Sequence, residues 1–540
     1  MTTPRNDSVF TLAQLLENNA RVRPDELYAI FPDVTITYGA LYERSRALAK
    51  GLIALGLEPG QHVGIMMPNC LDFLLAHFAV QLAGGKSVLY NARFKQHELA
   101  TVVPHTDARI VITTDRIRDH VDFAGLLAAT FPGLSDAPPP DGIALAEAPL
   151  LDHIVLFGET RWEPALSDAD LLARGASVPD SVLDSAHAAQ HPEHTAVMIY
   201  TSGTTAAPKA CKLSHASLQR AWRVYSRSVG LAPGETVWDP MPFFHSGGIG
   251  LITGIMACGA AILSTPHFDP DLVAQLIEEY RVEHLYPGFH TLSLPVLRSP
   301  HYDRARWTGF VKSMVNVGPL GTQYVIRDLL PPDVPIMNLF GMSESSGLFM
   351  LTPPDAPEDK RLASSGRPLH GAEAKIVDPE TLEELPADTR GEIVFRGAGA
   401  FRGYYKDPAH THKTILADGW VRTGDLGMFD AEGWLYFLGR LKDMLKVGGE
   451  NVAAAEVESF LSGHPAVKFV QVLGRSDERL GEVPVAFVEC NPGMSVDEEG
   501  LLAFCKGQIA NFKIPRQVIF VTEWPMSATK VQKFRLRELL

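Results

Sequence analysis

The sequence contains few cysteines, only five in 540 residues. No two of them form a CxxC pair and none has a histidine at zinc-ligand spacing, so the pattern indicates neither a disulfide framework nor a zinc site. Positive charge is also scarce, since 48 Lys and Arg residues stand against 63 Asp and Glu, a net charge of −15. This excess disfavours nucleic acid and anionic membranes as partners. We expect a reducing, cytoplasmic setting.

Signals for export and membrane insertion are also lacking. The first nine residues show no basic stretch followed by an apolar core, as a secretory signal would require. One uncharged stretch, residues 243–266, has the length of a membrane span. Its five glycines and its histidine, His245, favour close helix packing beside a pocket instead. The sequence therefore predicts no integral membrane span.

The chain is long enough for three or four domain-sized units. Its first third alternates helical and strand patterns, which we assign to a helix over 10–19 capped by Thr11, a strand at 62–67, a helix over 70–83 and a strand at 87–90. This alternation predicts a parallel, doubly wound sheet. The stretch 132–193, rich in Ala, Asp and Pro, is typical of a variable surface region.

Beyond Asp378 the pattern changes to short β-type runs separated by turn residues. After Gly439 helices and strands alternate again over about one hundred residues. We therefore predict an α/β N-terminal domain over 1–438 with a β-rich subdomain at about 379–438, a hinge at 439–442, and a small α+β C-terminal domain over 443–540.

The clearest chemical motif is the segment 200–209, YTSGTTAAPK, which follows the apolar run 196–199. Its hydroxyls and backbone N–H groups can donate hydrogen bonds to a polyphosphate, and Lys209 supplies positive charge. The segment is not a Walker A loop, because that loop requires GxxxxGK followed by Ser or Thr. An ordinary turn rich in Ser and Thr is the alternative interpretation.

This loop and the motifs around it resemble the adenylate-forming superfamily, which comprises acyl-CoA synthetases, adenylation domains of peptide synthetases and luciferases. The other motifs occur in the family's order: ITY at 36–38, FGMSE at 340–344, TGD at 423–425, GRLKD at 439–443, GGEN at 448–451 and PMSATK at 525–530. The resemblance covers nearly the whole chain. It implies ATP, Mg²⁺ and coenzyme A as cofactor and substrates, and a mobile C-terminal domain.

The resemblance also implies which residues bind the nucleotide. Phe340 offers a ring for adenine, Asp425 and Arg440 can bind the ribose hydroxyls, and Glu344 can hold Mg²⁺ against the phosphates. The full predicted nucleotide-binding set is Thr201, Ser202, Gly203, Thr204, Thr205, Lys209, Gly318, Pro319, Phe340, Gly341, Met342, Ser343, Asp425, Arg440, Gly448 and Gly449.

Two lysines are implied as catalytic residues, one for each half-reaction. Lys530 matches the lysine that contacts the carboxylate and the α-phosphate during adenylation, and Lys446 matches a position that faces the active site during thioester formation. The C-terminal domain would rotate about Lys442 between the two. The family's glycine before the final lysine is missing, which makes Lys533 a rival for Lys530, and Ala206 and Ala210 replace glycines of the loop.

The acyl group is expected near His245, which matches a family position beside the carboxylate. Gly247, Gly248, Asn316 and Gly347 are the predicted pocket walls, with room for a medium-chain or cyclic acid. The predicted function is an AMP-forming carboxylic acid–CoA ligase, for which a homodimer is compatible. The alternatives are a ligase that loads a carrier protein from acyl-AMP, and a catalytically weak protein that binds acyl groups or nucleotides.

Overall fold

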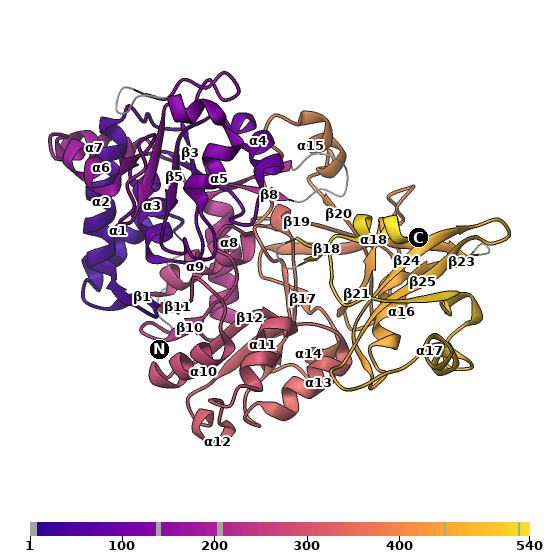
Figure 1. Ribbon diagram of the computed structural model, residues 1–540. Helices are drawn as coiled ribbons and strands as arrows, with labels where there is room; N and C mark the ends of the chain where they lie inside the picture. Colours follow the sequence, from indigo (N-terminus) through magenta and orange to yellow (C-terminus); the bar gives the residue numbers. More distant parts are fainter. Residues whose placement is uncertain (1–7, 137–141, 202–208, 448–449, 528–529) are drawn as a thin grey trace.

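The computed structural model describes residues 8–136, 142–201, 209–447, 450–527 and 530–540. Figure 1 shows a large α/β body, a β-rich part beside it and a C-terminal part at the right of the view. This is the α/β N-terminal domain with a β-rich subdomain and the α+β C-terminal domain that the sequence predicts.

The body contains two seven-stranded sheets, each parallel except for one edge strand. The first has the order β7-β6-β5-β3-β4-β8-β9 and comprises β3 (His62–Met66), β4 (Lys86–Leu89), β5 (Ala108–Thr114), β6 (His153–Phe157), β7 (Leu166–Ser167), β8 (Thr195–Thr201) and β9 (Lys209–Ser214). The second has the order β14-β13-β12-β10-β11-β1-β2 and comprises β1 (Leu27–Phe31), β2 (Val34–Thr37), β10 (Thr236–Trp238), β11 (Ala261–Leu263), β12 (His284–Phe289), β13 (Ser313–Val317) and β14 (Ile336–Met337).

The helices of the body follow the expected start signals. Helix α1 begins at Leu12 after the N-cap Thr11, whose hydroxyl accepts a hydrogen bond from the Gln14 amide, as predicted. Every residue of α3 is buried, and one hydrophobic cluster joins residues of α1, α3, α8 and α9 to both sheets. The helices are α1 (Leu12–Val22), α2 (Tyr38–Ala54), α3 (Leu71–Leu82), α4 (Gln96–His105), α5 (Phe123–Thr130), α6 (Asp168–Gly175), α7 (Asp180–Ala188), α8 (His215–Ser228), α9 (Ser246–Cys258), α10 (Pro270–Glu279), α11 (His290–Leu297), α12 (Arg304–Trp307), α13 (Leu320–Leu329), α14 (Glu358–Ala363) and α15 (Pro408–Thr414).

The expectation of a variable surface region over 132–193 is wrong in part. Strand β6 lies inside the first sheet, between β5 and β7, and four of its five residues are buried. Helix α6 packs closely on α2, because a Cβ on Gly51 would lie 2.4 Å from the Leu171 carbonyl oxygen. The Ala- and Asp-rich composition hides these elements, since their apolar faces are short.

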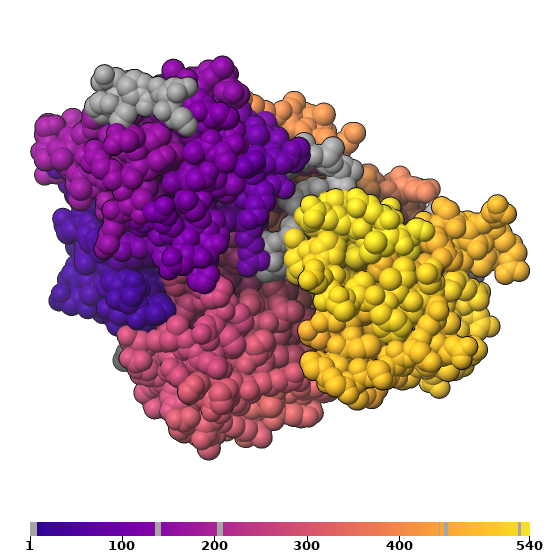
Figure 2. Space-filling view, viewed as in Figure 1, coloured from indigo at the N-terminus to yellow at the C-terminus, as the bar shows by residue number. Residues whose placement is uncertain are grey.

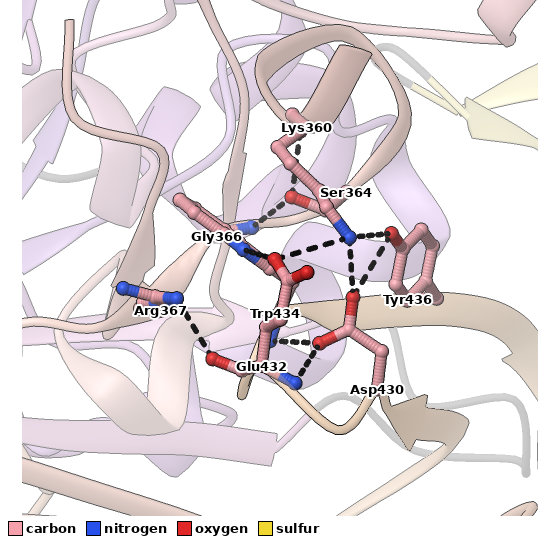
Figure 3. Close-up of polar contacts among 8 residues, drawn as sticks. All are labelled: Lys360, Ser364, Gly366, Arg367, Asp430, Glu432, Trp434 and Tyr436. Carbon is pink, nitrogen blue, oxygen red and sulfur yellow. Dashed lines mark hydrogen bonds and ion pairs between the residues drawn. The ribbon is translucent and has the colours of Figure 1, made fainter. Parts of the chain in front are cut away.

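The β-rich subdomain is a four-stranded antiparallel sheet, β18 (Ala372–Val377), β19 (Gly391–Gly397), β20 (Val421–Phe429) and β21 (Leu435–Arg440). A smaller sheet of β15 (Leu339–Phe340), β16 (Met350–Leu351) and β17 (Arg367–Pro368) leads into it. Figure 3 shows how α14 is tied to the β20–β21 turn: the Lys360 ammonium donates to Asp430 Oδ2 at 2.7 Å, and the Arg367 guanidinium lies 4.1 Å from the centre of the Trp434 ring.

The C-terminal part forms its own lobe in Figure 2 and has its own hydrophobic clusters. It contains β22 (Met444–Val447), β23 (Glu450–Ala453), α16 (Ala454–Leu461), β24 (Val467–Asp477), β25 (Gly481–Cys490), α17 (Glu498–Cys505), β26 (Gln517–Phe520), β27 (Met526–Ser527), β28 (Lys530–Val531) and α18 (Lys533–Leu536). An ion pair between Arg390 and Glu456, at 3.6 Å, crosses to the β-rich subdomain. Within the part of the chain that the structure describes, no helix has the length and apolar character to cross a bilayer.

Candidate active site

The predicted phosphate loop connects two antiparallel strands at the edge of the first sheet. Thr201, the last residue of β8, is the register partner of Lys209, the first residue of β9. Ser202, Gly203, Thr204 and Thr205 lie outside the described residues. The two described ends nevertheless fix where the loop leaves and rejoins the sheet.

Strand β9 is covered by a segment of the β-rich subdomain, residues 401–405. The Arg402 amide donates to the Lys212 carbonyl at 2.8 Å, and the Tyr405 amide donates to the Ala210 carbonyl at 2.8 Å. Ala210 is fully buried here, so its methyl group, where the family has glycine, is accommodated in the strand. The subdomain thus reaches the base of the phosphate loop.

Glu344 lies beside this covering segment, in the 3₁₀ turn 343–345. Its side chain is buried, with Oε1 accepting a 2.6 Å hydrogen bond from the Tyr404 hydroxyl, and its backbone carbonyl accepts from the Phe401 amide at 2.8 Å. The Lys209 ammonium lies 5.4 Å from the centre of the Tyr404 ring. Lys209, Tyr404 and Glu344 are therefore neighbours, and the sequence had indicated only the first and the last.

The surroundings of Glu344 fit a magnesium site of the kind the sequence predicts. Mg²⁺ in nucleotide enzymes is commonly held by one or two carboxylates together with substrate phosphates. Glu344 is one such carboxylate, and the neighbouring Cys211 thiol does not compete for the metal, because burial raises the pKa of that thiol well above its usual value. Glu344 would hold the ion, with the phosphates of ATP as its other ligands.

Phe340 and the turn that follows it form one wall of the site. The Phe340 ring lies 5.4 Å, centroid to centroid, from both Phe437 of β21 and Phe349. Gly341 is required by close packing, because a Cβ there would lie 2.2 Å from the Gly347 carbonyl oxygen. Met342 and Ser343 continue this turn to Glu344.

Asp425 and Arg440 face each other across β20 and β21, where they are register partners. The Arg440 Nε atom lies 2.8 Å from Asp425 Oδ1, and the Asp425 side chain is almost completely buried while the Arg440 side chain is 40% exposed. A buried carboxylate held on one side by arginine can accept hydrogen bonds from vicinal hydroxyls through its remaining lone pairs. The Phe437 ring, also on β21, links this pair to Phe340.

The predicted catalytic lysines lie in the C-terminal part. The backbone of Lys446 belongs to β22 and that of Lys530 to β28, while Lys442 lies in the turn 441–443; the side chains of these three lysines, and Gly448 and Gly449, fall outside the described residues. Lys533, the rival of Lys530, is engaged elsewhere: its ammonium lies 2.7 Å from Glu458 Oε1 of α16. That contact gives Lys533 a role inside the C-terminal part.

The glycines of α9 do not enlarge a pocket at the positions where their surroundings are close. A Cβ on Gly248 would lie 2.3 Å from the Pro242 carbonyl oxygen, and one on Gly250 would lie 1.9 Å from the Trp222 indole nitrogen. Gly347 likewise faces Trp222, at 2.7 Å. Only Gly247 has space beside it, with its nearest neighbour at 3.5 Å. The expectation that Gly248 and Gly347 leave volume for an acyl chain is therefore corrected: protein atoms occupy that volume.

Trp222 of α8 is the residue that fills the space between α8 and α9. Its side chain is fully buried, its indole N–H donates to the Ser346 carbonyl at 2.7 Å, and its ring contacts Tyr225 and Tyr286. The sequence gave no sign of this, because the position reads as an ordinary apolar residue on a helix face. His245 lies at the start of α9, as its N-cap residue, beside the Phe244 ring.

Asn316, Gly318 and Pro319 lie where β13 ends and α13 begins. The Asn316 amide donates to the Gln323 side chain at 2.9 Å and its oxygen accepts from the Ser293 hydroxyl at 2.8 Å. Asn316 therefore ties β13 to α11 and α13, a supporting role rather than that of a free pocket wall. Pro319 is the N-cap residue of α13, and Gly318 precedes it.

Comparison with known proteins assigns both parts of the chain. Residues 16–405 match the family model of the AMP-binding enzymes, and residues 456–530 match that of the AMP-binding enzyme C-terminal domain. A Bacillus subtilis protein named "Putative acyl-CoA synthetase YngI" is 33% identical over 543 residues, covering 98% of this chain and 96% of its own length. The mitochondrial medium-chain acyl-CoA ligase ACSF2 of Pongo abelii is 30% identical, covering 98% and 87%. The structure of ATP-bound MatB from Rhodopseudomonas palustris is similar with a TM-score of 0.83 and 26% identity, covering 98% and 99%.

Proposed function

The chain belongs to the AMP-binding enzyme family, and on that premise we propose that it is an ATP-dependent carboxylic acid–CoA ligase. The observation that carries the proposal is the arrangement of two buried carboxylates, Glu344 and Asp425, on the two sides of the Phe340–Phe437 wall. Buried carboxylates are costly unless they serve a bound partner. Metal-bound phosphates and a ribose are partners of the right chemistry for these two sites.

The first half-reaction joins the acid to the α-phosphate of ATP. A carboxylate oxygen attacks phosphorus, the bond to pyrophosphate breaks, and pyrophosphate leaves with the electron pair, giving acyl-AMP. Lys209 and the loop after Thr201 hold the phosphates, and Lys530 supplies positive charge where the negative charge develops. A bound Mg²⁺ supplies Lewis-acid charge neutralisation at the phosphates, and Glu344 is the residue that holds it.

The second half-reaction makes the thioester. The CoA sulfur attacks the acyl carbon, and AMP leaves with the electron pair of the carbon–oxygen bond. The two transition states differ in shape and charge, so we propose that the C-terminal part moves about Lys442 and exchanges Lys530 for Lys446. The hinge at 439–442 and the domain limits at 438 and 443 belong to this proposal, as do the cytoplasmic setting, the homodimer and the lack of a nucleic-acid partner.

The substrate we propose is a medium-chain or cyclic carboxylic acid. The relatives' names support this class, and Trp222 supplies a reason for an upper limit on length, because its indole already fills the space between α8 and α9. An acid bound near His245 would meet this ring before it could pass between the two helices.

The test is AMP release from a panel of carboxylic acids with and without CoA. The proposal expects acid-dependent pyrophosphate release without CoA in a single turnover, and continuous AMP release only when CoA is present. AMP release that requires a carrier protein instead of CoA would identify the carrier-loading alternative. Failure to form acyl-AMP from any acid would favour the non-catalytic alternative. The Asp425→Ala variant serves as a control, since it should weaken ATP and AMP binding alike.

A further inference from the structure

The segment 401–405 joins three parts of the site that come from different regions of the chain. Its backbone pairs with β9, its first residue binds the Glu344 carbonyl, and the Tyr404 side chain lies between the Glu344 carboxylate and the Lys209 ammonium. No motif that the sequence analysis used includes Tyr404. We propose that Tyr404 is a positioning residue of the metal and phosphate site, which orients Glu344 through its hydroxyl and Lys209 through its ring.

The first step of the argument is that Tyr404 is held rigidly. Gly403 has φ +89°, a conformation that favours glycine, and a Cβ there would lie 2.6 Å from the Thr411 methyl group. The Tyr404 amide donates to the Thr411 hydroxyl at 2.9 Å, and the Tyr404 side chain is only 7% exposed. A side chain fixed in this way can fix the groups that it contacts.

The second step concerns the direction of the hydrogen bond. Burial, with the nearby Glu344 as a smaller cause, raises the pKa of the Tyr404 hydroxyl well above its usual value, so the hydroxyl stays protonated and donates to Glu344 Oε1. At 2.6 Å this is a short bond between a hydroxyl and a carboxylate, the stronger class of hydrogen bond. It leaves the second carboxylate oxygen to face a cation.

The third step concerns Lys209. Its ammonium lies 5.4 Å from the ring centre, within the range of a cation–π contact. The loop before Lys209 has no other described aromatic neighbour of this kind among the contacts of that lysine. The ring therefore directs the positive charge at the end of the phosphate loop, and the hydroxyl of the same residue directs the negative charge that holds the metal.

The experiment separates hydroxyl from ring, and both from general stability. Tyr404→Phe removes only the hydroxyl, whereas Tyr404→Leu removes the ring as well. Tyr405→Phe is the matched control: the Tyr405 hydroxyl makes a 2.7 Å hydrogen bond to a carboxylate, that of Asp107, on the outer side of the same segment. ATP binding is measured by calorimetry over a series of Mg²⁺ concentrations, without added acid or CoA.

We expect Tyr404→Phe to need about tenfold more Mg²⁺ for half-maximal ATP binding, an effect in the range for a hydrogen bond to a charged group. Saturating Mg²⁺ should restore its affinity. Tyr404→Leu should bind ATP more weakly even without Mg²⁺, because Lys209 has lost its ring. Tyr405→Phe should match the wild type in both measurements. An Mg²⁺ requirement equal in Tyr404→Phe and Tyr405→Phe would overturn the proposal.

A double variant keeps the test decisive if Tyr404→Phe loses stability. If the hydroxyl acts through Glu344, adding Tyr404→Phe to Glu344→Gln should not raise the Mg²⁺ requirement further. An additive increase would contradict the proposal. The inference rests on the proposed function, but the two fail differently: wild-type protein that binds no ATP with Mg²⁺ would refute the function, whereas normal wild-type binding with unchanged variants would refute only the role of Tyr404.

Discussion

Two adjacent glycines of α9, Gly247 and Gly248, should respond to the same substitution with opposite signs. A Cβ on Gly248 would lie 2.3 Å from the Pro242 carbonyl oxygen, and real Cβ atoms do not come closer than 3.0 Å, so the backbone must open by 0.7 Å. The atoms in the way belong to the backbone of Met241 and Pro242 and cannot rotate aside. Forcing a buried group into occupied space costs roughly 1–3 kcal/mol.

Gly247→Ala, by contrast, adds a methyl group whose nearest neighbour is the end of the Met241 side chain at 3.5 Å, an ordinary contact. Replacing glycine by alanine inside a helix stabilises by roughly 0.4–1 kcal/mol when the space is free, largely by restricting the unfolded chain. The two variants should therefore differ in denaturation midpoint in opposite directions from the wild type. Urea or thermal denaturation of the three proteins under one condition measures this.

The substrate profile gives the second readout for Gly248→Ala. His245 caps α9, so a shift of the first turn displaces it from the site for every acid. We expect turnover to fall for acids of all lengths by a similar factor, with the preferred length unchanged. If Gly248→Ala were as stable as wild type and moved the preference toward shorter acids, Gly248 would line the acyl pocket and the packing argument would be refuted.

The remaining predictions concern the lysines and the pH. Lys530→Ala should slow acyl-AMP formation by two to three orders of magnitude, roughly 3–4 kcal/mol, yet make thioester from supplied acyl-AMP, while Lys446→Ala should do the opposite; rapid-quench assays of each half-reaction measure both. Lys533→Ala should lower the denaturation midpoint but keep both half-reactions, because its partner is Glu458; selective loss of adenylation in that variant would instead make it the catalytic lysine. Burial lowers the pKa of His77 and of His215 to about 3. Each is then neutral when folded but gains a proton when unfolded below pH 6.5, so stability should fall as the pH drops below 6.5, by about 1.4 kcal/mol per pH unit for each histidine. Urea titrations at pH 7.5 and 5.5 measure this slope, and an unchanged slope in His77→Gln would contradict it.

The sequence predicted the elements whose patterns are set locally. The Thr11 cap, the strand over 62–66 and the helix over 71–82 follow from capping chemistry and from apolar runs ended by turn residues. Strand β6 and helices α6 and α7 escaped because their apolar faces are completed only by neighbours such as α2, which come from elsewhere in the chain. Composition alone made that region look like surface.

The candidate site was predicted as far as ordered motifs reach. Glu344, Asp425 and Phe340 were named from the motifs and lie where two sheets meet. Tyr404 and Trp222 were missed because their meaning depends on partners 60 and 124 residues away in the chain, Glu344 and Ser346. A tyrosine in a turn and a tryptophan on a helix face carry no local sign of such contacts.

The β-rich subdomain controls the site more directly than its sequence suggests. It provides Tyr404, Asp425 and Arg440, whereas Lys209 comes from the first sheet. The distances between these groups therefore depend on how firmly the subdomain is held against the body. The pairing of residues 401–405 with β9 holds it at the phosphate loop, and the Lys360 cluster of Figure 3 holds it at the far end of β20 and β21. Two attachments at opposite ends prevent the subdomain from rocking, so the movement required between the two half-reactions is left to the segment after Arg440.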